Sequence, residues 1–192
     1  MRNRSEVLDE YLVLSCQRGQ REALELLAKR WHPKMVRYAC RMTGSVDAAA
    51  DLVQDSWLAI ARGIRRLKDP TCFRSWAYRI VTNKCRDWIR RQQRDRARSS
   101  ELPAETVDPA TLRGLDQRIM RLRIALKRLT VERRAILSMY YLEGFSVSEI
   151  GRTLDIPPGT VKSRLFRARQ ELRAELEDSN ETENRFDRQT DS

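Results

Sequence analysis

The sequence predicts an all-α protein made of two small helical domains that a flexible linker joins. Apolar residues recur at spacings of three and four along almost every long segment, which is the period of an amphipathic helix. Alternating runs of Val, Ile and Thr, which are typical of strands, are absent from the sequence. One stretch, 96–115, loses the helical period and is rich in Ser, Pro and acidic residues, so we expect the linker there. A chain of 192 residues is long enough for two small domains.

The first domain is expected over residues 1–95. Its periodic segments predict helices at 8–16, 22–41, 46–64 and 73–91. Thr43-Gly44-Ser45 interrupts this pattern, and Ser45 is a suitable N-cap for the helix that follows. Asp69-Pro70-Thr71 predicts a loop before the last helix, which is strongly basic.

The second domain is expected over residues 116–176, and an acidic, flexible tail at 177–192. Its periodic segments predict helices at 115–129, 131–143, 147–154 and 160–176. Thr130 is a suitable N-cap for the second of these helices, and Gly144 is suited to end it.

The net charge of +11 is divided unevenly along the chain. Residues 62–98 carry thirteen basic and three acidic side chains, and residues 118–170 carry twelve and four. An acidic connector separates these two blocks, and the tail from Glu171 onward is again acidic. One basic block would fit a solvated surface, whereas two favour two contacts with one polyanion, and nucleic acid fits better than a membrane surface.

The sequence gives no sign of membrane insertion, secretion, a metal site or catalysis. No apolar run approaches the roughly 18 residues of a membrane helix, and the polar N-terminus is no secretory signal, so we expect a cytoplasmic protein. The four cysteines form no CxxC pair and His32 is the single histidine, so we expect reduced thiols, no metal and no cofactor. Without a Ser/His/Asp or Cys/His arrangement we expect no catalytic residues and no enzyme.

Residues 146–176 predict a helix-turn-helix. Ser146 and Glu149 form a capping box at the start of a short helix, and the prolines within 155–159 force a turn before a second helix. The second helix has one apolar stripe, formed by Val161, Leu165, Ala168 and Leu172. Its other side suits the major groove of DNA, and the alternative is an ordinary amphipathic helix with a solvated basic face. The candidate DNA-contacting residues are Thr160, Lys162, Ser163, Arg164, Phe166 and Arg167.

Longer runs of residues in this region carry a family resemblance. The runs are Tyr140-Tyr141-Leu142-Glu143-Gly144-Phe145-Ser146, Glu149-Ile150-Gly151, Gly159-Thr160-Val161-Lys162-Ser163-Arg164-Leu165 and Arg167-Ala168-Arg169. With them the sequence resembles the extracytoplasmic-function (ECF) branch of the sigma-70 family of bacterial transcription initiation factors. The resemblance implies that residues 116–176 form a sigma4-like helix-turn-helix domain, which reads the promoter −35 element.

The first domain is similar to the same family at two places, which implies a sigma2-like helical bundle. Asp51-Leu52-Val53-Gln54-Asp55, with Trp57 after it, resembles the family segment that docks on the RNA polymerase clamp. Helical spacing places the polar side chains on one face and Val53, Trp57 and Ile60 on the other. An acidic face in a basic protein suits a protein partner, and the alternative is a plain solvated face. The candidate polymerase-binding residues are Asp51, Leu52, Gln54, Asp55 and Leu58.

The second place is the basic helix that begins at Phe73. Phe73-Arg74-Ser75-Trp76-Ala77-Tyr78-Arg79-Ile80 resembles the family helix that recognises the −10 element. Interleaved arginines and aromatic residues are typical of single-stranded DNA binding, although Trp76 is more typical of a core residue at this spacing. The candidate residues for the −10 element are Arg79, Asn83, Lys84, Asp87, Arg90 and Arg91.

The resemblance implies a promoter-specificity subunit. Such a factor binds core RNA polymerase at its clamp and flap, reads the −35 and −10 elements in duplex and melted promoter DNA, and promotes strand opening. It also implies an anti-sigma factor as an inhibitory partner. The alternatives are a free-standing helix-turn-helix regulator, which would need no docking helix, and a nuclease, for which the sequence shows no cluster of carboxylates.

Overall fold

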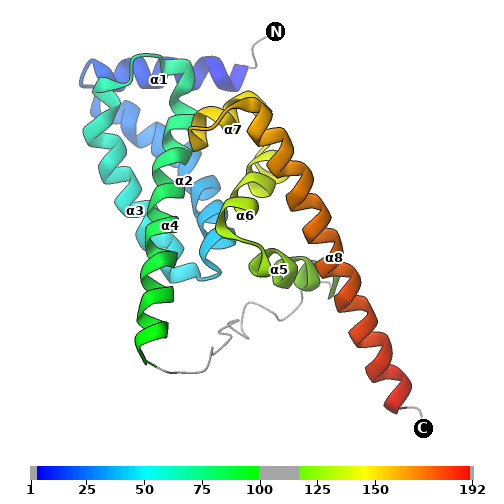
Figure 1. The fold of residues 1–192 in the computed structure, drawn as a ribbon. Coiled ribbons are helices and arrows are strands. Elements are labelled where there is room, and N and C mark those ends of the chain that lie inside the picture. The colour runs from blue at the N-terminus through cyan, green and yellow to red at the C-terminus, as the bar shows by residue number, and fades with distance from the viewer. Residues whose placement is uncertain (1–3, 100–116, 191–192) are drawn as a thin grey trace. The chain divides into compact units, whose positions relative to one another are not determined.

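The computed structural model describes residues 4–99 and 117–190, and every regular element in these ranges is a helix. The predicted all-α class is therefore confirmed. The chain divides into two compact units (Figure 1). Helices α1–α4 make up unit 1, and α5, α6 and α8 form the body of unit 2.

Unit 1 is a bundle of four helices with two short 3₁₀ turns. Its elements are α1 (Arg4–Gln17), α2 (Arg21–Thr43), α3 (Val46–Gly63), η1 (Ile64–Arg66), η2 (Pro70–Cys72) and α4 (Phe73–Ser99). Helix α1 lies across the end of the bundle where η1 and η2 join α3 to α4 (Figure 1). Gln17 fixes this end, because its Nε2 donates to the carbonyl oxygens of Ile64 and Leu67 at 3.1 and 2.7 Å.

Aromatic packing holds α2 against α4. The Trp31 ring lies 6.1 and 6.2 Å from the rings of Phe73 and Tyr78, in edge-to-face geometry. The Tyr38 ring lies 5.1 Å from that of Tyr78, and its hydroxyl is 2.9 Å from the Thr82 hydroxyl. All five residues are buried, so this cluster fixes the register of the basic helix on the rest of unit 1.

A glycine allows α3 to approach α4 closely. A Cβ atom at Gly63 would lie 2.8 Å from a ring carbon of Trp76, which is closer than carbon atoms pack. Ser45 caps the other end of α3 as predicted, because its side chain accepts from the Ala48 N–H at 3.2 Å. Asp69 precedes η2 and accepts from the Thr71 hydroxyl, and the Thr71 and Cys72 hydrogen bonds lower the pKa of its carboxyl group.

Unit 2 contains α5 (Gln117–Arg128), α6 (Val131–Leu137), a π-helical turn η4 (Ser138–Leu142), the first half of α7 (Val147–Leu154) and α8 (Pro158–Thr190). The predicted single helix over 131–143 is therefore wrong in its last part. The Glu143 N–H donates to the Ser138 carbonyl at 3.0 Å, five residues back, which widens the turn. Thr130 caps α6 as predicted, and Gly144 ends the segment with a left-handed φ of 66°.

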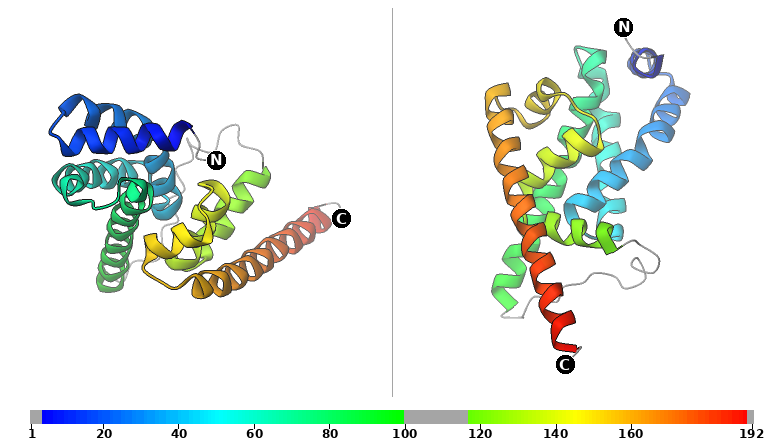
Figure 2. Two further views of the ribbon diagram at one scale, coloured as in Figure 1. Left: turned by 90° about the horizontal axis from the view of Figure 1, so that it is seen from above. Right: turned by 90° about the vertical axis from the view of Figure 1, so that its right-hand side faces the viewer.

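Two helices are longer than predicted. Helix α4 continues to Ser99, so the first four residues of the expected linker are helical, and the rest of the linker lies outside the described residues. Helix α8 is one unbroken helix to Thr190 (Figure 2), so the predicted end near residue 176 is wrong. No Gly or Pro follows Gly159, and the Arg173–Glu177 ion pair at 2.7 Å has the i,i+4 spacing that supports a helix.

The cysteines differ in burial, and we expect them to differ in reactivity. Cys16 and Cys85 are buried and Cys40 and Cys72 half-buried. Burial raises the pKa of the Cys16 thiol, and that of Cys85 to about 12, so both stay protonated at pH 8. Iodoacetamide should therefore alkylate Cys40 and Cys72 at least about tenfold faster than the other pair, as followed by mass spectrometry. Equal rates at all four positions would contradict this prediction.

Candidate functional surfaces

Helix α3 presents an acidic face to solvent. Asp51, Gln54 and Asp55 are exposed and Leu58 is 54% exposed, at the i, i+3, i+4 and i+7 positions of one helix face. On the opposite side, Val53 and Ile60 are fully buried and Trp57 is half-buried. We call the exposed set, with Asp47, the α3 acidic face.

One predicted member does not lie on this face, and one was missed. Leu52 is only 7% exposed and packs in the core of unit 1, because it follows Asp51 by one position and turns away from the face. Asp47 is exposed and precedes Asp51 by one helical turn, so it extends the same surface. The spacing of four between the two aspartates is the signal that could have found it.

Helix α4 presents a basic face. Its exposed residues among those predicted are Arg79, Asn83, Asp87, Arg90 and Arg91, of which the first four recur every three or four positions and Arg91 adjoins Arg90. The other side of α4 carries Ala77, Tyr78, Val81 and Cys85, all buried, so Tyr78 is a core residue and Trp76 is half-buried. Five of the six predicted residues are therefore exposed. Lys84 lies beside them on α4 and is half-buried.

An ion pair connects the two faces. Lys84 Nζ lies 3.3 Å from Asp55 Oδ2, with side-chain exposures of 31% and 62%. Exposed pairs of this kind contribute about 0–1 kcal/mol. The pair therefore joins the surfaces of α3 and α4 without contributing much to the stability of unit 1.

Helices α7 and α8 have the local geometry of a helix-turn-helix. The capping box is formed: Glu149 Oε2 accepts from the Ser146 N–H at 2.8 Å, and Ser146 Oγ accepts from the Glu149 N–H at 3.2 Å. Asp155 has a left-handed φ of 58° in the turn, and Pro158 begins α8.

The two sides of α8 are divided as predicted. Val161, Leu165 and Ala168 are buried, and Leu172 is half-buried. The exposed predicted residues are Lys162, Ser163, Arg164, Phe166 and Arg167, and Thr160 is half-buried. Phe166 is 57% exposed, so this side of α8 presents one aromatic side chain among polar and basic ones.

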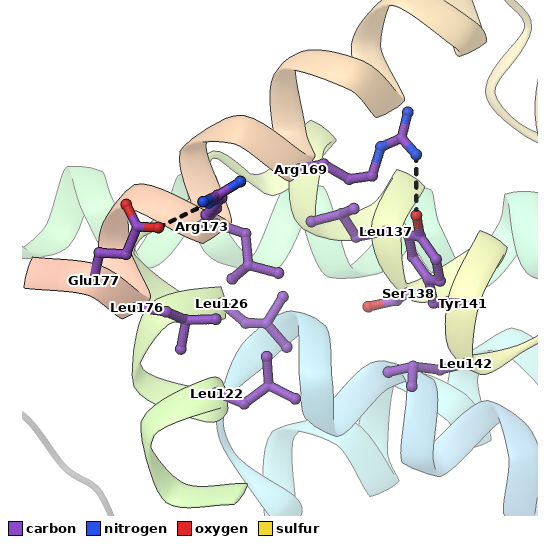
Figure 3. A pocket seen from close by; sticks show the side chains of 11 residues that line it. Leu122, Leu126, Leu137, Ser138, Tyr141, Leu142, Arg169, Arg173, Leu176 and Glu177 are labelled. Carbon is purple, nitrogen blue, oxygen red and sulfur yellow. Dashed lines mark hydrogen bonds and ion pairs between the residues drawn. The ribbon is translucent and has the colours of Figure 1, made fainter. Parts of the chain in front are cut away.

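An apolar groove lies on unit 2 between α5, the end of α6, η4 and α8. Its volume is about 530 Å³, and Figure 3 shows leucines converging on it from these elements. The leucines are Leu122, Leu126, Leu137, Leu142, Leu172 and Leu176. Arg169 donates to the Tyr141 hydroxyl at 3.5 Å at one end, and the Arg173–Glu177 pair frames the other. We call this feature the unit 2 groove, which no periodic pattern in the sequence predicted.

Among residues 4–99 and 117–190, no three His, Cys, Asp or Glu side chains lie close enough together to hold a metal ion. None of the described helices combines the length and the apolar character that a bilayer-spanning helix requires.

Both units match known families. Residues 27–95 match the family described as Sigma-70 region 2, and residues 119–172 match the one described as Sigma-70, region 4. The fold is also similar to that of CnrH, solved in complex with the cytosolic domain of CnrY. The TM-score is 0.70 at 24% identity, over 88% of this chain and 97% of CnrH.

Known proteins are similar in sequence to this chain over most of its length. One is the ECF RNA polymerase sigma factor SigM of Mycobacterium tuberculosis, 33% identical over 170 residues, with 88% of this chain and 85% of that protein covered. Another is the ECF RNA polymerase sigma factor SigE of Mycolicibacterium smegmatis, 34% identical over 152 residues. The match covers 77% of this chain and 59% of SigE, so the chain spans about three fifths of that relative. Since the similarity to SigM extends over both helical units, this chain belongs to the family of ECF RNA polymerase sigma factors.

Proposed function

We propose that this sigma factor is the promoter-specificity subunit of a bacterial RNA polymerase and catalyses no reaction itself. In this proposal unit 1 is the sigma2-like domain and unit 2 the sigma4-like domain. The α3 acidic face docks on the polymerase clamp, and the unit 2 groove receives an element of the flap. The basic face of α4 contacts the −10 element, and the exposed side of α8 reads the −35 element.

The observation that carries the proposal is the division of charge within unit 1. Asp47, Asp51 and Asp55 are exposed on α3, whereas α4 exposes Arg79, Arg90 and Arg91. The acidic side chains would be repelled by phosphates, and the basic ones attract them. A free-standing regulator needs only the basic surface, so the acidic face favours a factor that binds a protein and DNA together.

Strand opening is assigned to the basic face of α4. Asn83 lies one helical turn after Arg79 and one before Asp87, all exposed, so an amide is flanked by a cation and an anion. Amide side chains can hydrogen-bond the edge of an extruded base, while arginines hold the backbone of the separated strand. We assign Asn83 to the extruded base and Arg90 and Arg91 to phosphates.

An anti-sigma factor is the inhibitory partner in this proposal. Covering either the α3 acidic face or the unit 2 groove would block a contact with polymerase. Leu58 and Leu142, more than half exposed, offer apolar contacts on these two surfaces. A partner that binds both would hold the factor inactive in the cytoplasm.

Transcription with purified core polymerase tests the proposal. The full chain should co-purify with core enzyme and direct run-off transcription from a subset of a promoter library. Permanganate footprinting should show melted thymines near −10 only when core is present. A chain that binds duplex promoters tightly alone, and gives no transcript with core, would instead be a free-standing regulator.

Reading of the −35 element should depend on Arg167. It is exposed on α8 beside Phe166, opposite the buried stripe. If its guanidinium contacts a base edge, Arg167→Ala should weaken promoter binding by the holoenzyme by about 1–3 kcal/mol and relax the preference at one base pair. Arg123→Ala is the matched control, since it removes the same charge from an exposed position on α5 that does not line the unit 2 groove. A uniform loss across all −35 sequences would show a phosphate contact instead.

A further inference from the structure

A buried hydroxyl at the bottom of the unit 2 groove has no hydrogen-bond partner. Ser138 is 1% exposed, and its Oγ is unpaired among the described residues. Buried side-chain hydroxyls are bonded in the large majority of cases, and a helical serine commonly donates to the carbonyl four residues back. Ser56 on α3 does so, with its Oγ 2.6 Å from the Leu52 carbonyl oxygen. Ser138 therefore differs from a buried serine elsewhere in the same chain.

The hydroxyl points into the groove. Ser138 is one of the lining residues, and Figure 3 shows its oxygen turned toward the space between the leucines. The residue begins η4, and its own N–H already occupies the carbonyls of Arg134 and Ala135. An unpaired polar atom in an apolar groove is a cost to the free protein that a bound polar group would remove.

The dimensions and charge of the groove suit a helix. Along α8 it extends from Arg169 to Glu177, which is about 12 Å, or two helical turns. The Arg173 cation is offset by Glu177, whereas Arg169 contacts the neutral Tyr141 hydroxyl. An amphipathic helix with an acidic side chain near Arg169 complements this surface.

We propose that Ser138 is a specificity-determining residue of this groove. Its hydroxyl hydrogen-bonds a polar side chain on an acidic, amphipathic helix of core RNA polymerase whose apolar side chains lie among the groove leucines. This inference rests on the proposed function. It adds that the groove selects a helix with one polar side chain at the position facing Ser138, and disfavours one that is apolar there.

The test compares core binding with stability in Ser138→Ala. Losing a hydrogen bond made only in the complex should raise the Kd for core polymerase about 3- to 10-fold, by fluorescence anisotropy of the labelled full chain. The melting temperature of the free protein should stay the same or rise, because the unpaired hydroxyl is gone. Ser56→Ala is the matched control: its hydroxyl is bonded in the free protein, so its melting temperature should fall.

The possible outcomes separate this inference from the proposed function. If the unaltered chain fails to bind core, the proposed function is wrong. If it binds, Leu142→Ala weakens binding, and Ser138→Ala does not, the groove is used but Ser138 is not a specificity residue. A fall in the melting temperature of Ser138→Ala would show a structural role. If the free protein forms a dimer that Ser138→Ala weakens, the groove belongs to a second copy, which overturns the proposal.

Discussion

Reversing the charge at Asp51 and Asp55 together is expected to abolish binding to core polymerase. Both carboxylates are exposed on the α3 acidic face, and the double Asp→Arg variant changes the charge of that face by four. Opposing like charges across an interface cost several kcal/mol, so the Kd for core should rise at least about 100-fold. Equilibrium binding of the labelled full chain to core enzyme measures this change.

The fold should survive the double substitution. Neither carboxylate is buried, and among the described residues the one ion pair lost is that of Asp55 with Lys84 at 3.3 Å, which contributes about 0–1 kcal/mol. Helix content and melting temperature should therefore be unchanged within a few degrees. The control is Glu22→Arg with Glu25→Arg, which makes the same change of charge on exposed positions of α2. An equal loss of binding in this control would show that the affinity for core polymerase depends on the net charge of the chain and not on the α3 acidic face.

The helices of this protein were predictable because local patterns agree with the tertiary structure. The caps at Ser45, Thr130 and Ser146 depend on residues within three positions, so the sequence contains all their partners. The buried stripe of α8 follows from helical period alone. Most of the candidate site could be predicted for the same reason, since exposed residues on one helix face share a spacing.

Most of the wrong predictions concern features that depend on packing between helices. Leu52 is an exception, because its position one residue after Asp51 already turns it away from the exposed face by helical period. The end of α8 was placed too early because a polar composition was taken to mean fraying, although no residue in it breaks a helix. The π-helical turn at Ser138 and the unit 2 groove depend on packing between α5, α6 and α8, which no periodicity reveals.

Arg134 is another residue whose role the sequence does not show, and replacing it should destabilise unit 2. It lies on α6 and is 8% exposed, and burial lowers the pKa of its guanidinium, which still keeps its proton at neutral pH. Its Nε donates to the Leu126 carbonyl at 2.9 Å, and its Nη2 to those of Lys127 and Leu129 at 2.7 and 3.1 Å. The carbonyls of Leu126 and Lys127 lie in the last turn of α5 and that of Leu129 follows the helix, where carbonyls lack the intrahelical N–H partners of a continuing helix.

Arg134→Met removes these donors from a buried place while keeping a similar length of side chain. The carbonyls left unpaired destabilise unit 2, whereas removal of a buried charge offsets part of this loss. The net free energy of unfolding of unit 2 should fall by about 3 kcal/mol. Arg134→Lys should lose less, because one ammonium group can replace only part of the guanidinium fork. Arg133→Met is the matched control: Arg133 pairs with Glu171 at 2.6 Å, both 36% exposed, and should cost about 0–1 kcal/mol.

Urea denaturation can assign the loss to one unit. All four tryptophans, at positions 31, 57, 76 and 88, lie in unit 1, so tryptophan emission follows that unit alone, whereas circular dichroism follows both. For Arg134→Met, part of the dichroism signal should unfold at lower urea while the tryptophan transition stays in place. Promoters that require the −35 element should lose transcription at the temperature where unit 2 unfolds. A shift of the tryptophan transition by the same amount, or an equal loss in Arg133→Met, would show that the three carbonyl contacts are not what holds α5 to α6.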